Sequence, residues 1–271
     1  AFLGLDIASP RGWTAFAFFL IAFALAVGGL LSSTFHLGHP ERALKAFTQW
    51  RSSWLSREAW AALAALGLMG LYAIGLIFLD ARWSLLGWLG GIMSLVTVFA
   101  TSMIYTQMRT VPRWNHWSPP VLFMGYALAG GALLTGQTTL AMLLLLVVFG
   151  LQIVAWVDQD RCERTSDTTL ATATGLGHLG QVRAFEPPHT GSNYLTKEMV
   201  FHVGRKHAQT LKLISAALIG PVPVLLLILP FNHVFAGLAV IAFLAGVLVQ
   251  RWLFFAEARH VVGLYYPQGR H

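Results

Sequence analysis

Long runs of uncharged, mostly apolar residues are the feature that most constrains this chain. Seven runs of roughly 18 to 24 residues are long enough to cross a hydrocarbon core about 30 Å thick as α-helices. They cover residues 13–34, 59–79, 84–108, 119–136, 138–157, 211–229 and 234–250. These runs show no alternation of apolar and polar residues with period two, so helices are favoured over a β-barrel. We therefore expect an all-α, polytopic transmembrane helix bundle that forms one domain over residues 1–271.

The composition agrees with this class, because 56% of the residues are hydrophobic and 11% are charged. The chain starts at Ala1 with an apolar stub, residues 1–5, followed by a turn. This start is consistent with an eighth span upstream or with a cleaved signal peptide. The single cysteine, Cys162, excludes an internal disulfide and an iron–sulfur cluster held by four thiolates of this chain, and we interpret it as a loop residue.

The distribution of Lys and Arg predicts the orientation, since basic residues near span ends are retained on the cytoplasmic side. Of the 18 basic residues, 16 lie in one set of alternating connectors, and only Arg11 and Arg82 lie in the other. The basic set comprises 35–58, 109–118, 158–210 with Lys212, and the tail from Arg251. We expect a multi-pass protein of the bacterial cytoplasmic membrane with these connectors and the C-terminus in the cytoplasm.

The interior of the predicted spans excludes several functions. The spans contain almost no ionisable residue, whereas an ion-coupled transporter normally needs acidic groups or interrupted helices inside the membrane. A non-redox transporter therefore remains only a less favoured alternative. No histidine lies inside a predicted span, so axial ligands for a membrane haem are missing. We predict no haem and no metal ligand in this chain, and we place the chemistry at the cytoplasmic ends of the helices.

The connector HLGHPERALKAFTQWRSSWLSRE, residues 36–58, holds the first candidate site. His36 follows the first span and Glu58 precedes the second, so both titratable groups lie at the membrane boundary. Such a pair can exchange protons with a lipid-soluble quinone, whose two-electron reduction takes up two protons. The alternative is structural, with His36 capping a helix and Glu58 paired with an arginine. Arg42 and Trp54 are further candidates for quinone contacts, although docking and interfacial anchoring also explain such residues.

Two further boundary clusters lie on the same predicted face. In SMIYTQMRTVPRWNHWSPP, residues 102–120, Tyr105 and Gln107 are the last polar groups of a span and Arg109 is the first charge after it. In VQRWLFFAEARH, residues 249–260, three charged residues follow at helical spacing: Arg251, Glu257 and Arg259. Convergence of the three clusters on one site would make Tyr105, Arg109 and Arg251 quinone-binding candidates.

These three stretches together resemble the membrane-anchor subunits of the dimethyl sulfoxide reductase type. The resemblance covers the chain from about residue 30 onward, and its most characteristic element is H-L-G-x-P at residues 36–40 with Glu58 downstream. In that family these two positions are tied to quinol binding. The resemblance implies eight helices, no haem, a quinone site in this subunit, and two partners on the docking face. These partners are a molybdenum subunit with a pterin cofactor and a subunit with iron–sulfur clusters.

The predicted cytoplasmic docking face favours the sulfite-oxidising branch of this family, because dimethyl sulfoxide reductase itself presents its soluble subunits to the periplasm. Residues 185–208 also resemble a segment of sulfite dehydrogenase (quinone) anchors. In this interpretation electrons from cytoplasmic sulfite oxidation reach membrane quinone in this chain. The alternative is an anchor of a terminal reductase that oxidises quinol. The long 158–210 connector is expected to contact a partner or to form a flexible linker, with an interfacial helix in its second half.

Overall fold

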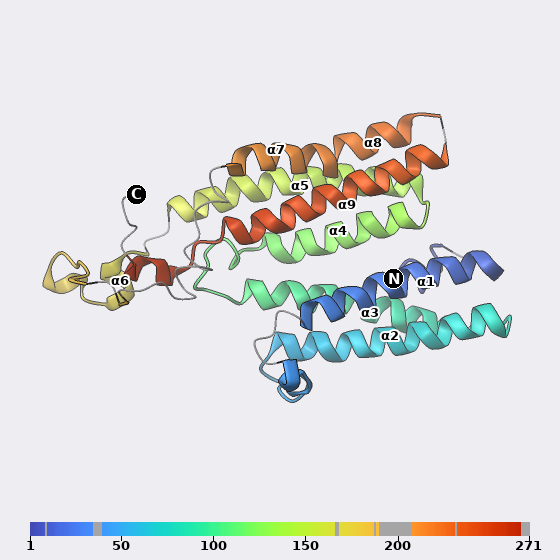
Figure 1. Ribbon diagram of the computed structural model, residues 1–271, viewed down its shortest axis with the longest axis horizontal. Coiled ribbons are helices and arrows are strands. Elements are labelled where there is room, and N and C mark those ends of the chain that lie inside the picture. Colours follow the sequence, from blue (N-terminus) through green and yellow to red (C-terminus); the bar gives the residue numbers. More distant parts are fainter. Residues whose placement is uncertain are drawn as a thin grey trace. The chain divides into compact units, whose positions relative to one another are not determined.

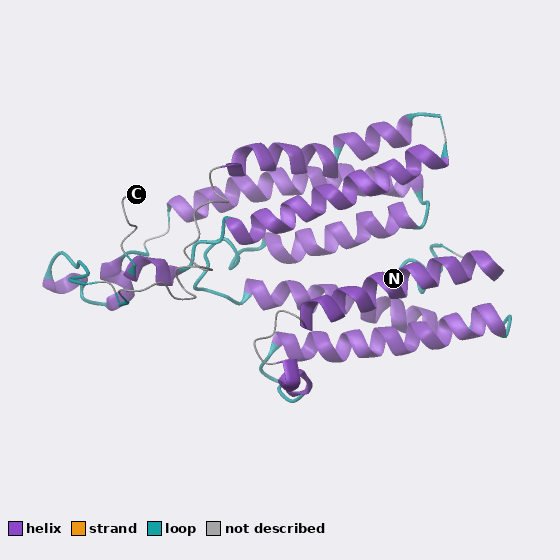
Figure 2. Ribbon diagram, viewed as in Figure 1, coloured by secondary structure: helices purple, strands orange, loops and turns teal. Residues whose placement is uncertain are grey.

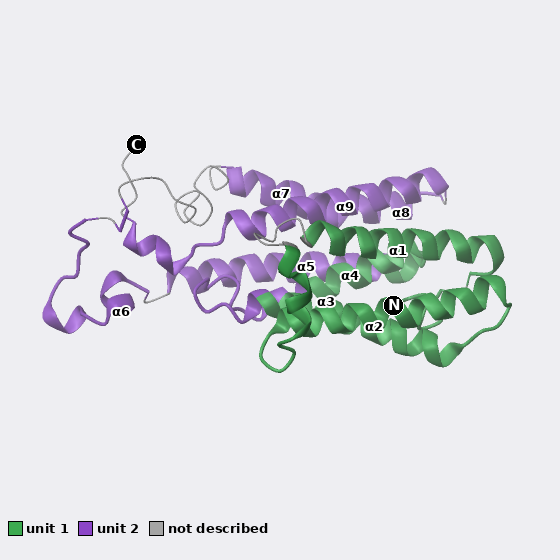
Figure 3. Ribbon diagram, turned by 60° about the horizontal axis from the view of Figure 1, so that its bottom comes forward, with its two compact units in different colours: residues 1–104, 123–141 green, residues 105–122, 142–271 purple. Residues whose placement is uncertain are grey.

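The computed structural model describes residues 1–8, 10–34, 40–165, 168–186, 188–189, 207–230 and 232–266. Helices and turns make up these residues, and none of them forms a strand (Figure 1; Figure 2). The predicted all-α class is therefore confirmed. The chain divides into two compact units (Figure 3). Unit 1 comprises Ala1–Ile104 and Phe123–Ala141, and unit 2 comprises Tyr105–Leu122 and Met142–His271. A single domain over residues 1–271 stays a prediction.

Unit 1 is built from α1 (Gly12–Thr34), the 3₁₀ helix η1 (Pro40–Phe47), α2 (Trp54–Phe78), α3 (Ser84–Thr106) and most of α4 (Ser118–Leu134). The apolar stub at its start is part of the core, since Phe2 and Leu3 are buried. A Cβ placed on Gly4 would lie 2.2 Å from the carbonyl oxygen of Gly87, so only glycine permits this backbone contact with α3.

Unit 2 contains α5 (Thr138–Arg164), α7 (Ala208–Ile219), α8 (Pro221–Ile228) and α9 (His233–Ala256), with the short elements α6 (Leu170–Thr174), η2 (Gly177–Leu179) and η5 (Val261–Tyr265). Pro221 lacks a backbone N–H and separates α7 from α8. Gly220 allows this break to approach α5, because a Cβ there would lie 2.7 Å from the Phe149 ring. The Ser215 hydroxyl donates to the carbonyl of Gly246 at 3.0 Å and ties α7 to α9.

Within the described residues, six helical segments are long and apolar enough to span a membrane: α1, α2, α3, α5, the α7–α8 pair and α9. The remaining predicted span, 119–136, corresponds to α4, which is apolar but has only 17 residues. Its first turn contains Pro119 and Pro120, which are tolerated there because the first N–H groups of a helix have no intrahelical partner. The span predictions thus agree broadly with the structure, and the difference is the length of α4.

Three helix ends differ from the predicted ones in a way that changes the position of a residue discussed above. Helix α2 begins at Trp54, so Glu58 lies inside the helix and not at the end of a connector. Helix α5 continues to Arg164, so Cys162 is helical and the predicted loop assignment is wrong. Helix α9 ends at Ala256, so Arg259 lies beyond the helix. The hydropathy pattern predicted the first two helices too short, because it ends a span where the apolar run ends. Polar residues that find partners can continue the helix beyond that run. At α9 the predicted helical spacing from Arg251 to Arg259 runs past the last helical turn.

Candidate functional site

Unit 1 contains a partly open cavity of about 530 Å³ between α1, α2 and α3. One face of α2 lines it with small residues, since Ala62 and Ala65 leave space that a larger side chain would fill. The α1 side contributes Phe19, Phe23, Ala26 and Gly29 at helical spacing. The walls are mainly apolar, with a few polar groups, so the cavity suits a largely apolar molecule with a polar end.

The ionisable side chain of this cavity is Glu58, one turn into α2. Its Oε1 accepts a hydrogen bond from the Thr101 hydroxyl of α3 at 2.6 Å. The same hydroxyl lies 2.9 Å from the carbonyl oxygen of Thr97. Because a hydroxyl has one hydrogen, Thr101 donates to only one of these acceptors at a time. The carboxyl group thus has a partner that can donate to it when ionised and accept from it when protonated.

Helical periodicity explains how the sequence places this pair. Glu58, Ala62, Ala65 and Met69 follow one another by three or four residues, so they share one face of α2. Ser94, Thr97 and Thr101 likewise share a face of α3. Ser94 and Thr97 donate to carbonyls four residues earlier, which satisfies their hydroxyl donors. Glu58 therefore stands out among these polar groups, because it faces the cavity with a group that exchanges protons.

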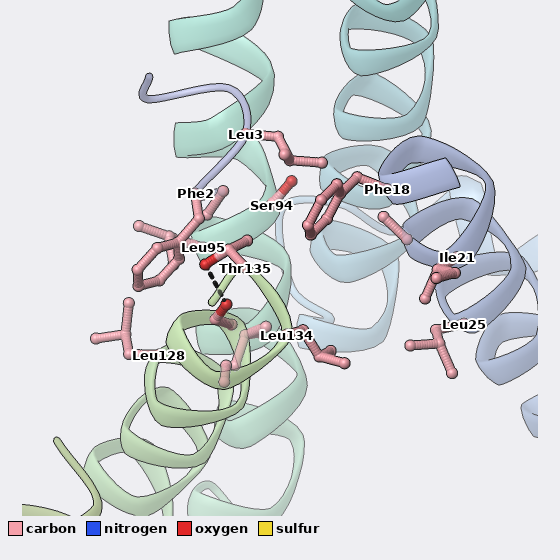
Figure 4. A pocket seen from close by; sticks show the side chains of 15 residues that line it. Phe2, Leu3, Phe18, Ile21, Leu25, Ser94, Leu95, Leu128, Leu134 and Thr135 are labelled. Atoms are coloured by element: carbon pink, nitrogen blue, oxygen red, sulfur yellow. Dashed lines mark hydrogen bonds between the residues drawn. The ribbon is translucent and has the colours of Figure 1, made fainter. Parts of the chain in front are cut away.

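A second cavity, about 220 Å³ in volume, lies in the same unit between α1, α3, α4 and the N-terminal residues. Figure 4 shows Phe2, Phe18, Leu25 and Leu128 around it. It shares five lining residues with the larger cavity: Ala1, Leu3, Ala22, Ser94 and Val98. The two cavities are therefore neighbours, and Glu58 lines the larger one.

The other sequence candidates of unit 1 lie outside the cavity wall. The Trp54 ring packs edge-on against Phe99, with a centroid distance of 6.1 Å, and the Arg57 guanidinium lies 4.4 Å from the Trp54 ring centroid. Arg42 is exposed on η1. Their contacts with a quinone stay predictions. The prediction for His36 falls outside the described residues.

Unit 2 brings together two sequence candidates, Tyr105 and Arg251. Both contact Phe254: the Tyr105 ring centroid lies 5.2 Å from it, and the Arg251 guanidinium lies 4.7 Å from it. Trp114 stacks on Phe254 at 5.2 Å and donates its indole N–H to the Phe254 carbonyl at 3.0 Å. Arg109 is exposed in the same loop. This aromatic cluster explains Tyr105 and Arg251 by packing, and their quinone contacts stay predictions.

A cluster of ionic groups in unit 2 was not predicted from the sequence. Arg113 pairs with Asp160 and Glu163 of α5, and its guanidinium lies 3.6 Å from Glu257 after α9. Lys212 of α7 pairs with Glu257 at 2.8 Å and with Asp160 at 3.7 Å. The Arg113 and Lys212 side chains are 10% and 8% exposed, so both charges depend on these partners. The cluster joins the loop before α4 to α5, α7 and the end of α9.

A smaller polar network fixes the end of the same loop. His116 lies 3.1 Å from Asp158 and 2.8 Å from the Ser118 hydroxyl, and the Trp117 indole N–H donates to Asp158 at 2.8 Å. The Cys162 sulfur lies near this network. The atoms of His116, Asp158 and Cys162 that could bind a metal ion lie within 4.8 Å of one another. Because His116 and Asp158 already satisfy each other, we assign this network to loop attachment.

Comparison with known proteins identifies the family. The family profile of the DMSO reductase anchor subunit (DmsC) matches residues 11–256. This chain belongs to the DMSO reductase anchor family. The anchor chain is also similar to a subunit of the sulfite dehydrogenase of Allochromatium vinosum, with 34% identity over 279 aligned residues, covering 91% of this chain and 84% of the relative. No solved structure matches it. The suspected membership is confirmed, and with it a multi-pass membrane anchor of a redox complex.

The structure adds Thr101 and the small residues Ala62 and Ala65 to the candidate site of this anchor. A threonine and two alanines in apolar helices are common, so their types alone gave no reason to select them. The helical spacing of Ala62 and Ala65 from Glu58 was the available signal, because it places them on the same face of α2. The partner of Glu58 could not be found this way, since Thr101 is 43 residues away.

Proposed function

We propose that this anchor binds membrane quinone in the unit 1 cavity and exchanges protons with it through Glu58. The observation that carries the proposal is a carboxyl group at the polar end of a 530 Å³ cavity with mainly apolar walls. A quinone combines a small polar ring with a long apolar tail. Its carbonyl oxygens need hydrogen-bond donors and protons, which Glu58 and Thr101 supply, and its tail fits the apolar walls.

In this proposal each turnover moves two electrons and two protons. The quinone carbonyls are reduced to hydroxyls, and Glu58 delivers a proton and is then reprotonated from the aqueous side of α2. His36 remains the predicted second proton-exchanging residue. The smaller neighbouring cavity supplies room for part of the isoprenoid tail, since the two cavities share wall residues. Electrons come from partner subunits that carry molybdenum pterin and iron–sulfur clusters, and this chain contributes no haem.

We further propose that the electrons originate from sulfite on the cytoplasmic side. The similarity to a sulfite dehydrogenase subunit and the 16 basic residues on one predicted face support this direction. The family description supports the second candidate, an anchor that oxidises quinol for a sulfoxide-reducing partner. Both candidates use the same cavity, and they differ in the direction of electron flow and in the substrate of the partner.

The deciding experiment uses the complex purified from membranes with its natural partner subunits. We expect sulfite to reduce added quinone at a rate that depends on the anchor. If the complex instead oxidises quinol with dimethyl sulfoxide and ignores sulfite, the second candidate is correct. If neither couple supports quinone turnover, the proposed function is wrong.

The described part of the 158–210 connector supports docking of such partners. Leu179 and Phe185 are 75% and 95% exposed, and few other large apolar residues lie in this part of the connector. Large apolar side chains exposed in a polar connector are typical of an interaction surface. We propose that this segment contacts a soluble partner protein on the cytoplasmic face of the inner membrane.

Loss of the Thr101 hydroxyl is expected to slow quinone turnover. Thr101→Val keeps the shape of the side chain but removes the donor to Glu58, and hydrogen bonds to charged groups contribute about 1.5–3 kcal/mol. We expect a decrease of roughly tenfold or more in kcat/KM for quinone. Thr101→Ser retains the hydroxyl and is the matched control, so it should stay near wild type. Equal activity of the Val and Ser variants would show that the hydroxyl has no function here.

Filling the cavity is expected to weaken quinone binding. Ala65→Leu places a large side chain in the wall opposite α1, and overpacking of this kind costs about 1–3 kcal/mol. We expect KM for quinone to rise roughly five- to 100-fold. Leu63→Met, on the exposed face of the same helix, is the control and should leave KM unchanged. An unchanged KM in Ala65→Leu would place the quinone outside this cavity.

A further inference from the structure

An open pocket on unit 1 is not explained by quinone binding. It has a volume of about 420 Å³ and is lined by Phe47, Trp50, Arg57 and Trp60, none of which lines the Glu58 cavity. The Phe47 and Trp60 rings meet edge to face at 5.3 Å. Trp50 and Trp60 are 57% and 50% exposed. The pocket therefore presents two indoles and one guanidinium to its surroundings.

Backbone carbonyls hold this pocket in shape. The Trp60 indole N–H donates to the Phe47 carbonyl at 3.0 Å, which fixes the end of η1 against α2. Arg57 donates to the carbonyls of Trp50 and Arg51 at 3.0 and 2.7 Å. Among the described residues, no carboxylate pairs with Arg57, so its positive charge is not neutralised. An anion can approach the guanidinium without displacing another anion.

The pocket continues into an apolar stripe along α2. Trp60, Leu63, Leu71, Ile74 and Phe78 are 48–71% exposed and share one face of the helix, with Gly67 between Leu63 and Leu71. They lie on a different face of the helix from Glu58, Ala62 and Ala65, which line the cavity. In a membrane-spanning helix such a stripe contacts acyl chains, and tryptophan at its end lies at the level of the headgroups. A molecule in the pocket therefore has an apolar track beside it.

The charge around the pocket selects the kind of headgroup. Three further basic residues of the same connector are exposed, namely Arg42, Lys45 and Arg51, and they outnumber the acidic Glu41. Arginine donates charge-assisted hydrogen bonds to phosphate oxygens, and basic residues at the membrane surface attract anionic lipids. We propose that this pocket binds an anionic phospholipid, with its phosphate at Arg57, its glycerol region between the indoles and an acyl chain along the α2 stripe. Lipid is favoured over a protein partner because the pocket opens onto the apolar stripe.

The test uses the whole complex in lipid nanodiscs that contain equal amounts of phosphatidylglycerol and phosphatidylcholine. Electron paramagnetic resonance of spin-labelled versions of the two lipids measures the fraction of each that the protein immobilises. We expect wild type to prefer phosphatidylglycerol, and Arg57→Gln to lower this preference about fivefold. Arg11→Gln removes an exposed positive charge from another connector of unit 1 and is the matched control.

Arg57 also donates hydrogen bonds to backbone carbonyls of the connector, so its loss could change the connector's structure. A second variant therefore tests the charge without touching Arg57. The double change Arg42→Gln and Lys45→Gln removes exposed charges of η1 and should lower the preference in the same direction. Equal immobilisation of the two lipids by wild type would overturn the proposal. It would also be overturned if Arg57→Gln kept the lipid preference but released the soluble subunits, since the pocket would then be a protein interface. Quinone turnover is not part of this readout, so the two proposals fail independently.

Discussion

Replacing Glu58 by glutamine in the intact complex is expected to stop quinone turnover while the partner subunits still accept electrons from the substrate. The amide keeps the size of the side chain and can still accept a hydrogen bond from Thr101, which lies 2.6 Å from the native carboxylate. It cannot exchange a proton at any ordinary pH. Proton transfer by a positioned group contributes roughly 10²–10⁴-fold to a rate, so we expect a loss of that size in kcat. Steady-state quinone reduction and single-turnover reduction of the proposed iron–sulfur partner separate the two steps.

The control is Glu41→Gln, which removes an exposed carboxylate from η1 in the same unit. It should leave both steps unchanged. If Glu58→Gln keeps full quinone activity with the complex intact, proton exchange occurs elsewhere, and Tyr105, Arg109 and Arg251 become the next positions to test. If cluster reduction is lost as well, the substitution has damaged docking and says nothing in favour of a proton-transfer role.

Replacing Arg113 by methionine is expected to give the largest loss of stability. The buried guanidinium contacts three carboxylates, those of Asp160, Glu163 and Glu257. Without it, Lys212 and the exposed Arg259 are the only cations that the described structure pairs with these acids. Breaking a buried ion pair by removing one partner costs about 3–5 kcal/mol, because the remaining charge stays desolvated and uncompensated. We expect a clear drop in the thermal unfolding temperature of the detergent-solubilised complex, followed by intrinsic tryptophan fluorescence.

Arg109→Met is the matched control, since Arg109 is an exposed cation four residues earlier in the same loop. Surface substitutions of this kind usually change stability by less than about 0.5 kcal/mol. The two variants should therefore differ strongly. Equal unfolding temperatures would mean that water or neighbouring cations compensate the three acids, and that the cluster does not hold the loop in place.

One residue of the candidate site, Glu58, could be predicted from the sequence. Glu58 was identified because it and His36 are titratable groups at the membrane boundary of one connector, and the family resemblance selected the same residue. Its environment was only partly predicted, since Trp54 packs against Phe99, Arg42 is exposed, and neither lines the cavity. Glu58 was predicted at the end of a connector, but helix α2 begins at Trp54, so Glu58 lies on one face of this helix. Sequence proximity placed these residues in one region but not around one cavity.

The helical, membrane-crossing class of this chain and the connectors that carry its positive charge could be predicted from the amino-acid sequence alone. These properties depend on the length of apolar runs and on counts of Lys and Arg, which are local. The contact of Thr101 with Glu58, and those of Arg113 with acids 47 and 50 residues later, could be found only in the three-dimensional structure. In apolar helices nearly every face is hydrophobic, so the pattern does not show which face meets a neighbour. Side-chain packing between helices makes that choice, and in unit 1 it leaves the cavity next to the Glu58 carboxylate.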